Sequence, residues 1–174
     1  CAWLACRTAS PRALSMSNAL SADAERKLLA ARRAGARLAA VQALYQMEQT
    51  EQSARSVIAD FMEDRLGLND EGEPVEEADP DIFKAIVDGT VERQETVDAA
   101  IMKRLASGWK IERLDATSRA ILRAGVYELI AEIGLPSQII LDEYVSIAHA
   151  FFEGAEPKFI NGLLDAVSRD VRAG

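Results

Sequence analysis

Apolar residues recur at intervals of three and four residues along most of the chain, and this period constrains the fold more than any other feature. Val57, Ile58 and Phe61 show it early in the chain, and Leu163, Leu164 and Val167 show it near the end. No alternating pattern typical of a strand and no long internal repeat accompanies it. The sequence therefore predicts an all-α fold, a compact bundle of about seven helices in two packed helical subdomains.

Start and stop residues delimit these helices. Ser21 or Asp23 is expected to cap the first helix, and Ser53 the second. Residues 121–133 are apolar on most sides, which is typical of a helix at the centre of a bundle. The expected spans are 21–49, 53–66, from 80 onward, 96–107, 121–133, 139–152 and 158–171.

The chain divides into an N-terminal extension and a helical domain. Residues 1–15 lack a starting Met and the pattern of a signal peptide, whereas Met16 resembles a natural start. We expect residues 1–20 to be a disordered or non-native extension and 21–174 to form the domain, with subdomains of roughly 21–94 and 95–172. Both cysteines, Cys1 and Cys6, lie in the extension, which fits a reducing cytoplasm.

An acidic segment and the lack of a long apolar run indicate how the chain meets solvent and membranes. Between residues 63 and 81, acidic residues far outnumber the single basic residue, Arg65, which predicts a solvated, flexible loop. No apolar run approaches the roughly 20 residues needed to span a bilayer, so we expect no membrane partner.

Catalytic signatures are missing from the sequence. The single histidine, His149, excludes His-based metal clusters and most triads, and it is expected at the edge of an apolar helix face. No glycine-rich phosphate loop occurs, and neighbours such as Asp142 and Glu143 point to different helix faces. We expect no enzymatic activity, no metal and no cofactor.

A cluster of basic residues opens the first predicted helix of a chain whose formal net charge is −8. At about 100° per residue, Arg26, Arg33 and Arg37 fall on one stripe, and the apolar face lies roughly 80° round from it, so packing that face leaves the arginines on an exposed shoulder of the helix. Such a stripe attracts polyanions locally, because salt confines the influence of each charge to roughly 8–10 Å. A solvated helix face is the alternative. Gly35 interrupts this helix, either as a tolerated surface glycine or to admit the close approach of another backbone.

Four segments occur in an order and spacing that closely resemble the NusB family of bacterial transcription antitermination factors. They are ARLAAVQALYQ (36–46), ILRAGVYEL (121–129), LDEYVSIAHAFF (141–152) and PKFINGLLDAV (157–167). The resemblance covers about residues 32–172. It implies a non-catalytic, all-helical protein that binds the boxA sequence of nascent ribosomal RNA as a heterodimer with NusE, a protein of the small ribosomal subunit. It also implies indirect association with RNA polymerase and other Nus factors, and some family members form homodimers.

The resemblance assigns roles to individual positions. Those it implies for RNA binding are Arg32, Arg33, Arg37, Lys158, Phe159 and Asn161. Those it implies for partner binding are Tyr45, Glu112, Arg113 and Ser118. Two positions depart from the pattern: Gly35 stands where some members carry another arginine, and Ser118 replaces an acidic residue found in some members.

Structural alternatives exist for several of these side chains. Phe159 and Tyr45 are suited to stack on RNA bases, yet Phe159 could equally anchor the last helix in the core and Tyr45 could lie at the core edge. Asn161 could simply tie down a helix start. Two other functions stay open: an accessory domain of a ribosomal RNA cytosine methyltransferase, and a protein-interaction bundle without RNA binding.

Overall fold

The structure is a computed structural model that describes residues 11–64, 66, 77–131 and 134–172, with side chains from residue 21 onward. Helices make up its regular structure, and no strand occurs within these ranges. They are α1 (Pro11–Thr50), α2 (Ala54–Asp64), α3 (Pro80–Glu92), α4 (Gln94–Met102), the 3-10 helix η1 (Ile111–Arg113), α5 (Ala116–Ala131), α6 (Ser137–Phe151) and α7 (Glu156–Val171). The predicted all-α bundle is confirmed.

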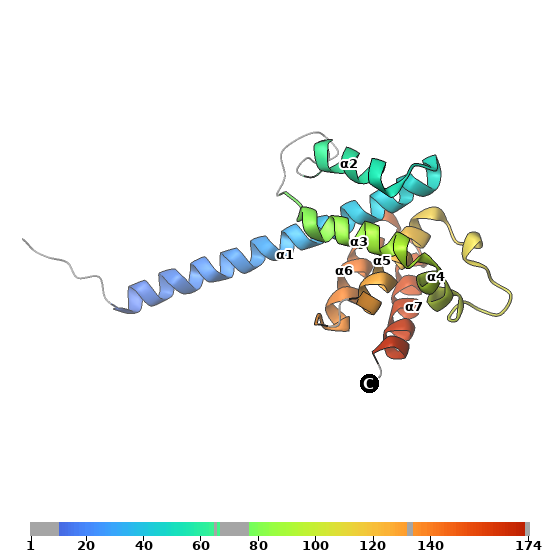
Figure 1. The fold of residues 1–174 in the computed structure, drawn as a ribbon. Helices are drawn as coiled ribbons and strands as arrows, with labels where there is room; N and C mark the ends of the chain where they lie inside the picture. The colour runs from blue at the N-terminus through green and yellow to red at the C-terminus, as the bar shows by residue number, and fades with distance from the viewer. Residues whose placement is uncertain (1–10, 65, 67–76, 132–133, 173–174) are drawn as a thin grey trace, which may run out of the picture.

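Helix α1 is longer than the sequence predicted. It begins at Pro11 rather than at Ser21 or Asp23, and no internal proline interrupts it. Proline is favoured in the first turn of a helix, where its missing N–H is not needed. Figure 1 shows the N-terminal part of α1 projecting away from the other helices, which pack around its C-terminal part. The predictions for residues 1–10 and for most of the acidic segment lie outside the described residues.

Side-chain caps fix several helix starts where the sequence placed them. The Ser53 hydroxyl accepts a hydrogen bond from Ser56 N at 3.3 Å, and Asp79 accepts bonds from Asp81 N and Ile82 N at 3.1 Å. Asp115 caps α5 by accepting from Ser118 N at 2.9 Å, so α5 begins at Ala116, before its predicted start at residue 121. Helix α4 differs from its prediction, because it begins at Gln94 and ends at Met102, well before Gly108.

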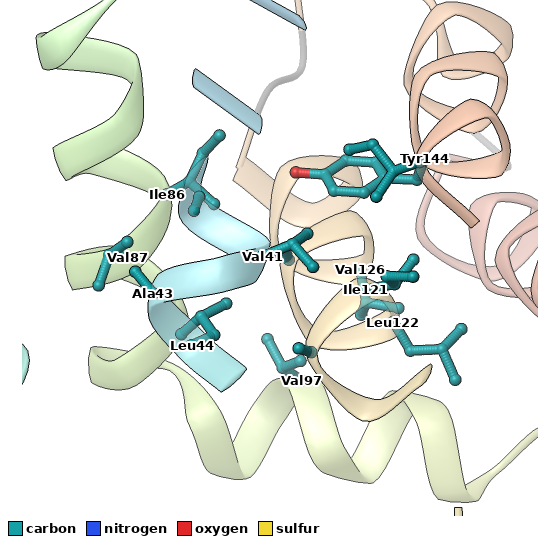
Figure 2. Packing of buried hydrophobic residues seen from close by; sticks show 14 of the residues in the cluster. Val41, Ala43, Leu44, Ile86, Val87, Val97, Ile121, Leu122, Val126 and Tyr144 are labelled. Carbon is teal, nitrogen blue, oxygen red and sulfur yellow. The ribbon is translucent and has the colours of Figure 1, made fainter. Parts of the chain in front are cut away.

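Helix α5 forms the centre of the bundle, as the sequence predicted. It packs against α1, α3, α4, α6 and α7. Figure 2 shows Val41 and Leu44 of α1 lying between α3 and α5, with Val97 of α4 below them. The buried apolar residues of all seven helices form one cluster. The subdomain boundary near residue 94 stays a prediction.

Pairs of contacts define the directions of the helices around α5. Arg37 and Glu48 of α1 bond to Glu128 and Arg119 of α5, so the two helices are antiparallel. Helix α7 runs in the same direction as α5, because a Cβ at Gly125 would lie 3.0 Å from Leu164, and Arg172 donates to Leu129 O at 2.9 Å. The start of α7 therefore lies toward the N-terminal end of α5, and the arginine cluster of α1 lies toward its other end.

Gly35 lies where α1 meets the segment before α3. A Cβ at this position would be 3.3 Å from the Cβ of Ala78. Asp79 N also donates to Arg32 O at 3.0 Å, so the two backbones meet over these residues. Of the two interpretations of Gly35, close approach of another backbone is the one that the structure supports.

None of the described helices combines the length and apolar character needed to cross a membrane.

Candidate nucleic-acid interface

Arg37 is buried, so its predicted place on an exposed shoulder of α1 is wrong. Only 4% of Arg37 is exposed. Its Nε lies 2.7 Å from Glu128 Oε2 and its Nη2 lies 3.0 Å from Glu128 Oε1, a two-pronged pair inside the protein. The reason is the helical register: at about 100° per residue, Arg37 lies within 40° of Val41 and Leu44, which face α5. The stripe of Arg26, Arg33 and Arg37 is therefore exposed at its first two residues and buried in the core at Arg37.

The Arg37–Glu128 pair is part of a larger buried group. Glu143 Oε2 lies 3.8 Å from Arg37 Nη1, and Tyr144 of α6 is completely buried beside the pair. The hydroxyl of Tyr144 points toward α1 (Figure 2). Burial alone would lower the pKa of Arg37, but its hydrogen bonds to Glu128 and the nearby carboxylate charges outweigh burial and raise the pKa. Arg37 therefore joins α1 to α5 and α6 as a permanently charged structural residue.

Burial and the negative charge of Glu128 also raise the pKa of the Tyr144 hydroxyl well above its ordinary value. Tyr144 therefore stays neutral at physiological pH and adds no charge to the group.

Arg32 and Arg33 have different environments, although they are neighbours in sequence. Arg32 is half-buried, and its Nε donates to Glu77 O at 3.1 Å, at the junction of α1 with the segment before α3. Arg33 is exposed, and no described residue forms a hydrogen bond or an ion pair with it. Of the three arginines implied for RNA binding, Arg33 alone has a guanidinium that is both exposed and unpaired among the described residues.

The first turn of α7 presents Lys158, Phe159 and Asn161 to solvent. Phe159 is 42% exposed, while Pro157 and Ile160 on either side of it are buried. The alternative in which Phe159 anchors the last helix in the core is therefore not realised. Asn161 is exposed and makes no hydrogen bond with the described residues, so it does not tie down the helix start either.

Tyr45 is 42% exposed on the C-terminal part of α1. It lies on the same level of the bundle as Glu48, toward the end of α5 at which α7 begins. Arg33 and Tyr45 are twelve residues apart, which corresponds to about 18 Å along the helix and about 120° around it. The residues implied for RNA binding therefore form two separate exposed groups, Arg33 at one end of the bundle and the α7 start at the other.

The positions implied for partner binding also divide into two kinds. Glu112 and Arg113 lie in η1 and are exposed. Ser118 is completely buried in the first turn of α5, and its hydroxyl has no hydrogen-bond partner. A direct partner contact requires an accessible side chain, so the expectation of a surface contact at Ser118 is wrong for the free chain. The side chain at this position has no access to solvent, so an acidic residue here would have to lose its hydration.

The network that holds η1 could not be predicted from the sequence. Arg119 of α5 donates to the carbonyl oxygens of Ile111, Glu112 and Leu114, and it also pairs with Glu48 at the end of α1. Arg123 donates to Asp98 of α4 at 2.8 Å and to Glu48 at 3.2 Å. The hydrogen bond from Arg119, together with the charges of both arginines, lowers the pKa of Glu48 despite its partial burial. Glu48 lies 71 residues from Arg119 and 75 from Arg123, so periodicity could not pair them.

No described group of three or more His, Cys, Asp or Glu side chains is arranged to hold a metal ion.

Comparison with known proteins places this geometry in a family. The NusB family profile matches residues 34–169. The transcription antitermination protein NusB of Hyphomonas neptunium is 63% identical over 143 residues, which cover 82% of this chain and 93% of the relative. The NusB protein of Caulobacter vibrioides is 52% identical over 140 residues, which cover 80% of this chain and 94% of the relative.

Solved structures share the fold. A crystal structure of the antitermination factors NusB and NusE in complex with dsRNA aligns with a TM-score of 0.67 at 26% identity, over 80% of this chain and 97% of that chain. NusB of T. maritima aligns with a TM-score of 0.66 at 25% identity, over 79% of this chain and 91% of that chain.

The fold and these matches together define a class of all-helical, non-catalytic transcription factors. The chain belongs to the NusB family of transcription antitermination proteins.

Proposed function

We propose that the chain supports antitermination by binding the boxA sequence of nascent ribosomal RNA together with NusE. In this role it joins RNA polymerase and other Nus factors through the assembled complex and acts in the cytoplasm, where transcripts are made. The observation that carries the proposal is Arg33 on α1, which is exposed and unpaired among the described residues. The solved relative that contains NusB, NusE and RNA supports both the RNA and the protein partner.

The exposed side chains suit an unpaired RNA strand. The planar guanidinium of Arg33 binds phosphate with two parallel hydrogen bonds and also stacks on bases. Phe159 offers an exposed ring on which a base can stack, beside the positive charge of Lys158. Because Arg33 and the α7 start lie at different ends of the bundle, a strand that contacts both has to be extended. Single-stranded RNA can adopt such a path. Arg37 and Glu128 are buried and do not contact the RNA in this arrangement.

Among the exposed side chains implied for RNA binding, only Arg33 and Lys158 are basic, which is why we expect the chain to need a protein partner. The chain carries a formal net charge of −8, and its buried or paired arginines do not add to an RNA surface. Each neutralised phosphate changes the log–log salt slope of single-strand binding by roughly 0.7, so a few contacts give weak, salt-sensitive binding. NusE therefore has to supply further RNA contacts.

The exposed η1 residues Glu112 and Arg113, together with Tyr45, are the surface that we assign to NusE. Arg119 holds the backbone of η1 from beneath, so Glu112 and Arg113 are presented on a fixed turn. Preorganisation of this kind lowers the entropy lost when a partner binds. Ser118 is buried, so its side chain is not part of this surface.

Equilibrium RNA binding, measured with and without NusE on boxA and scrambled oligonucleotides, tests this function. We expect weak binding by the chain alone and much tighter binding with NusE that favours boxA. Phe159→Ala should weaken the ternary complex by about 1–3 kcal/mol, the usual contribution of one stacked base. Val171→Ala, at an equally exposed apolar side chain on the last turn of α7, is the matched control and should have no effect. Equal affinity for boxA and scrambled RNA in the presence of NusE would overturn the proposal.

A further inference from the structure

The projecting part of α1 carries basic side chains that precede the region matched by the NusB family profile. Arg26 and Lys27 lie before residue 34, where that match begins. This part of α1 extends away from the bundle in Figure 1. The Arg26 and Lys27 side chains are 74% and 79% exposed. Both charges are therefore accessible from solvent and are not covered by another described part of the chain.

Arg26 continues the surface that begins at Arg33. The two residues are seven positions apart, so they lie on the same side of α1 and about 10 Å apart along its axis. This separation is close to the screening length of roughly 8–10 Å, within which charges reinforce each other. Arg26, Lys27, Arg32 and Arg33 outnumber the acidic residues Asp23 and Glu25 in this segment, although the whole chain is acidic. The projecting helix is thus a local cationic surface on an anionic molecule.

Within the described ranges, Asp23 is the one acidic side chain that pairs with these basic groups. Its carboxylate oxygens lie 3.4 Å from Arg26 Nη2 and 2.9 Å from Lys27 Nζ. All three side chains are largely exposed, and ion pairs between exposed side chains contribute little free energy because water and salt screen them. A phosphate group can therefore replace Asp23 as the partner of Arg26 and Lys27 at small cost.

We propose that Arg26 and Lys27 bind the phosphates of unpaired RNA flanking boxA, and so lengthen the RNA segment held by the protein. The inference rests on the proposed function, because Arg33 is the point from which the flanking strand continues along α1. Charge complementarity selects RNA as the occupant: this segment is basic and offers exposed cations, which match a phosphate backbone read without regard to sequence.

The test compares a boxA oligonucleotide with versions that carry an unpaired flank on either side, all in the presence of NusE. Two phosphate contacts at roughly 0.7 each add about 1.4 to the salt slope of the flanked RNA. The advantage of the flanked over the short RNA should consequently fall about sevenfold between about 50 and 200 mM salt. The double variant Arg26→Ala/Lys27→Ala should abolish this advantage without changing the affinity for the short RNA. Alanine favours helix, so α1 is retained.

Two further variants sharpen the result. Asp23→Asn frees Arg26 and Lys27 and should increase the advantage of the flanked RNA. Lys84→Ala/Arg93→Ala removes two exposed basic groups from the α3 region and should leave the advantage unchanged. A flanked RNA that binds no better than boxA alone would overturn the inference, while tight binding of the short RNA would leave the proposed function intact. A double variant that weakens short and flanked RNA equally would also overturn it, because the site would then not be specific to the flank.

Discussion

Arg33 and Arg37 are one helical turn apart, yet the protein uses them differently. Arg33 faces solvent and has no partner in the part of the chain that the structure describes, whereas Arg37 forms a two-pronged pair with Glu128 in the core. A buried charge needs its partner, because neither group can return to water while the protein is folded. Arg33 is therefore available for binding, and Arg37 contributes to the way α1 packs on α5 and α6.

Arg37→Met should destabilise the fold by about 3–5 kcal/mol, because it leaves the carboxylate of Glu128 buried without a partner. The double variant Arg37→Met/Glu128→Leu should recover most of this loss, since apolar side chains of similar size replace both charges. Unfolding in urea, followed by circular dichroism, measures both effects. A double variant as unstable as the single one would show that the pair itself, and not the unpaired charge, determines the loss.

Glu48 gives the fold a dependence on acid. Its pKa in the folded protein lies below the ordinary value, chiefly because Arg119 donates a hydrogen bond to it. The pKa in the unfolded chain is higher, so the contribution of Glu48 to stability is complete above the unfolded value and is lost as the pH falls through the folded value. We expect the difference in unfolding free energy between the parent and Glu48→Gln to be largest near pH 7 and to shrink toward about pH 3. A difference that stays constant with pH would contradict this role.

At the scale of the elements, η1 depends on a single side chain from α5. Arg119 donates to three carbonyl oxygens around this short turn while also pairing with Glu48. The carbonyl oxygens and Glu48 together use the full fork of the guanidinium, which a lysine could not do. The position of Glu112 and Arg113 therefore depends on Arg119, although Arg119 itself is only partly exposed.

Arg119→Ala should weaken NusE binding by about tenfold, or about 1.4 kcal/mol, because η1 is no longer held in one conformation. Arg123→Ala is the matched control: it removes pairs with Asp98 and Glu48 but no bond to η1. Calorimetric titration with NusE compares the two variants. If both lose the same affinity, the effect comes from the shared pair with Glu48 and not from η1.

Helix starts could be predicted well where a capping side chain lies next to the helix. Ser53 and Asp79 are local signals, and α2 and α3 begin directly after them. The start of α1 could not be predicted in this way. The residues between Pro11 and Ser21 also permit a helix, and no helix-breaking residue separates them from the rest of α1. The short η1 turn was missed because the hydrogen bonds from Arg119 to its carbonyl oxygens leave no periodic pattern in the sequence.

At the scale of the whole molecule, the sequence predicted the fold better than the site. Apolar periodicity defines which face of each helix is buried, and the central place of residues 121–133 followed from it. The same periodicity could not show that Arg37 would find Glu128, 91 residues later, and enter the core. The sequence also could not decide whether Phe159 is buried or exposed, because it is an apolar residue between Pro157 and Ile160, which are both buried.

The two exposed groups, Arg33 on α1 and the start of α7, lie toward opposite ends of α5. The molecule is therefore an anionic body with cationic and aromatic groups at separate points, and RNA has to follow its surface to contact both. An acidic body also repels RNA that lacks these contacts, which favours specific over non-specific binding.

The salt dependence of boxA binding by the Arg33→Ala variant, in complex with NusE, is the most direct test that Arg33 contacts RNA while Arg37 holds the fold. We expect the log–log slope to fall in magnitude by roughly 0.7, the value for one lost phosphate contact, with helicity and unfolding free energy unchanged. An unchanged slope would contradict an RNA contact at Arg33 and place the RNA-binding surface elsewhere on the molecule.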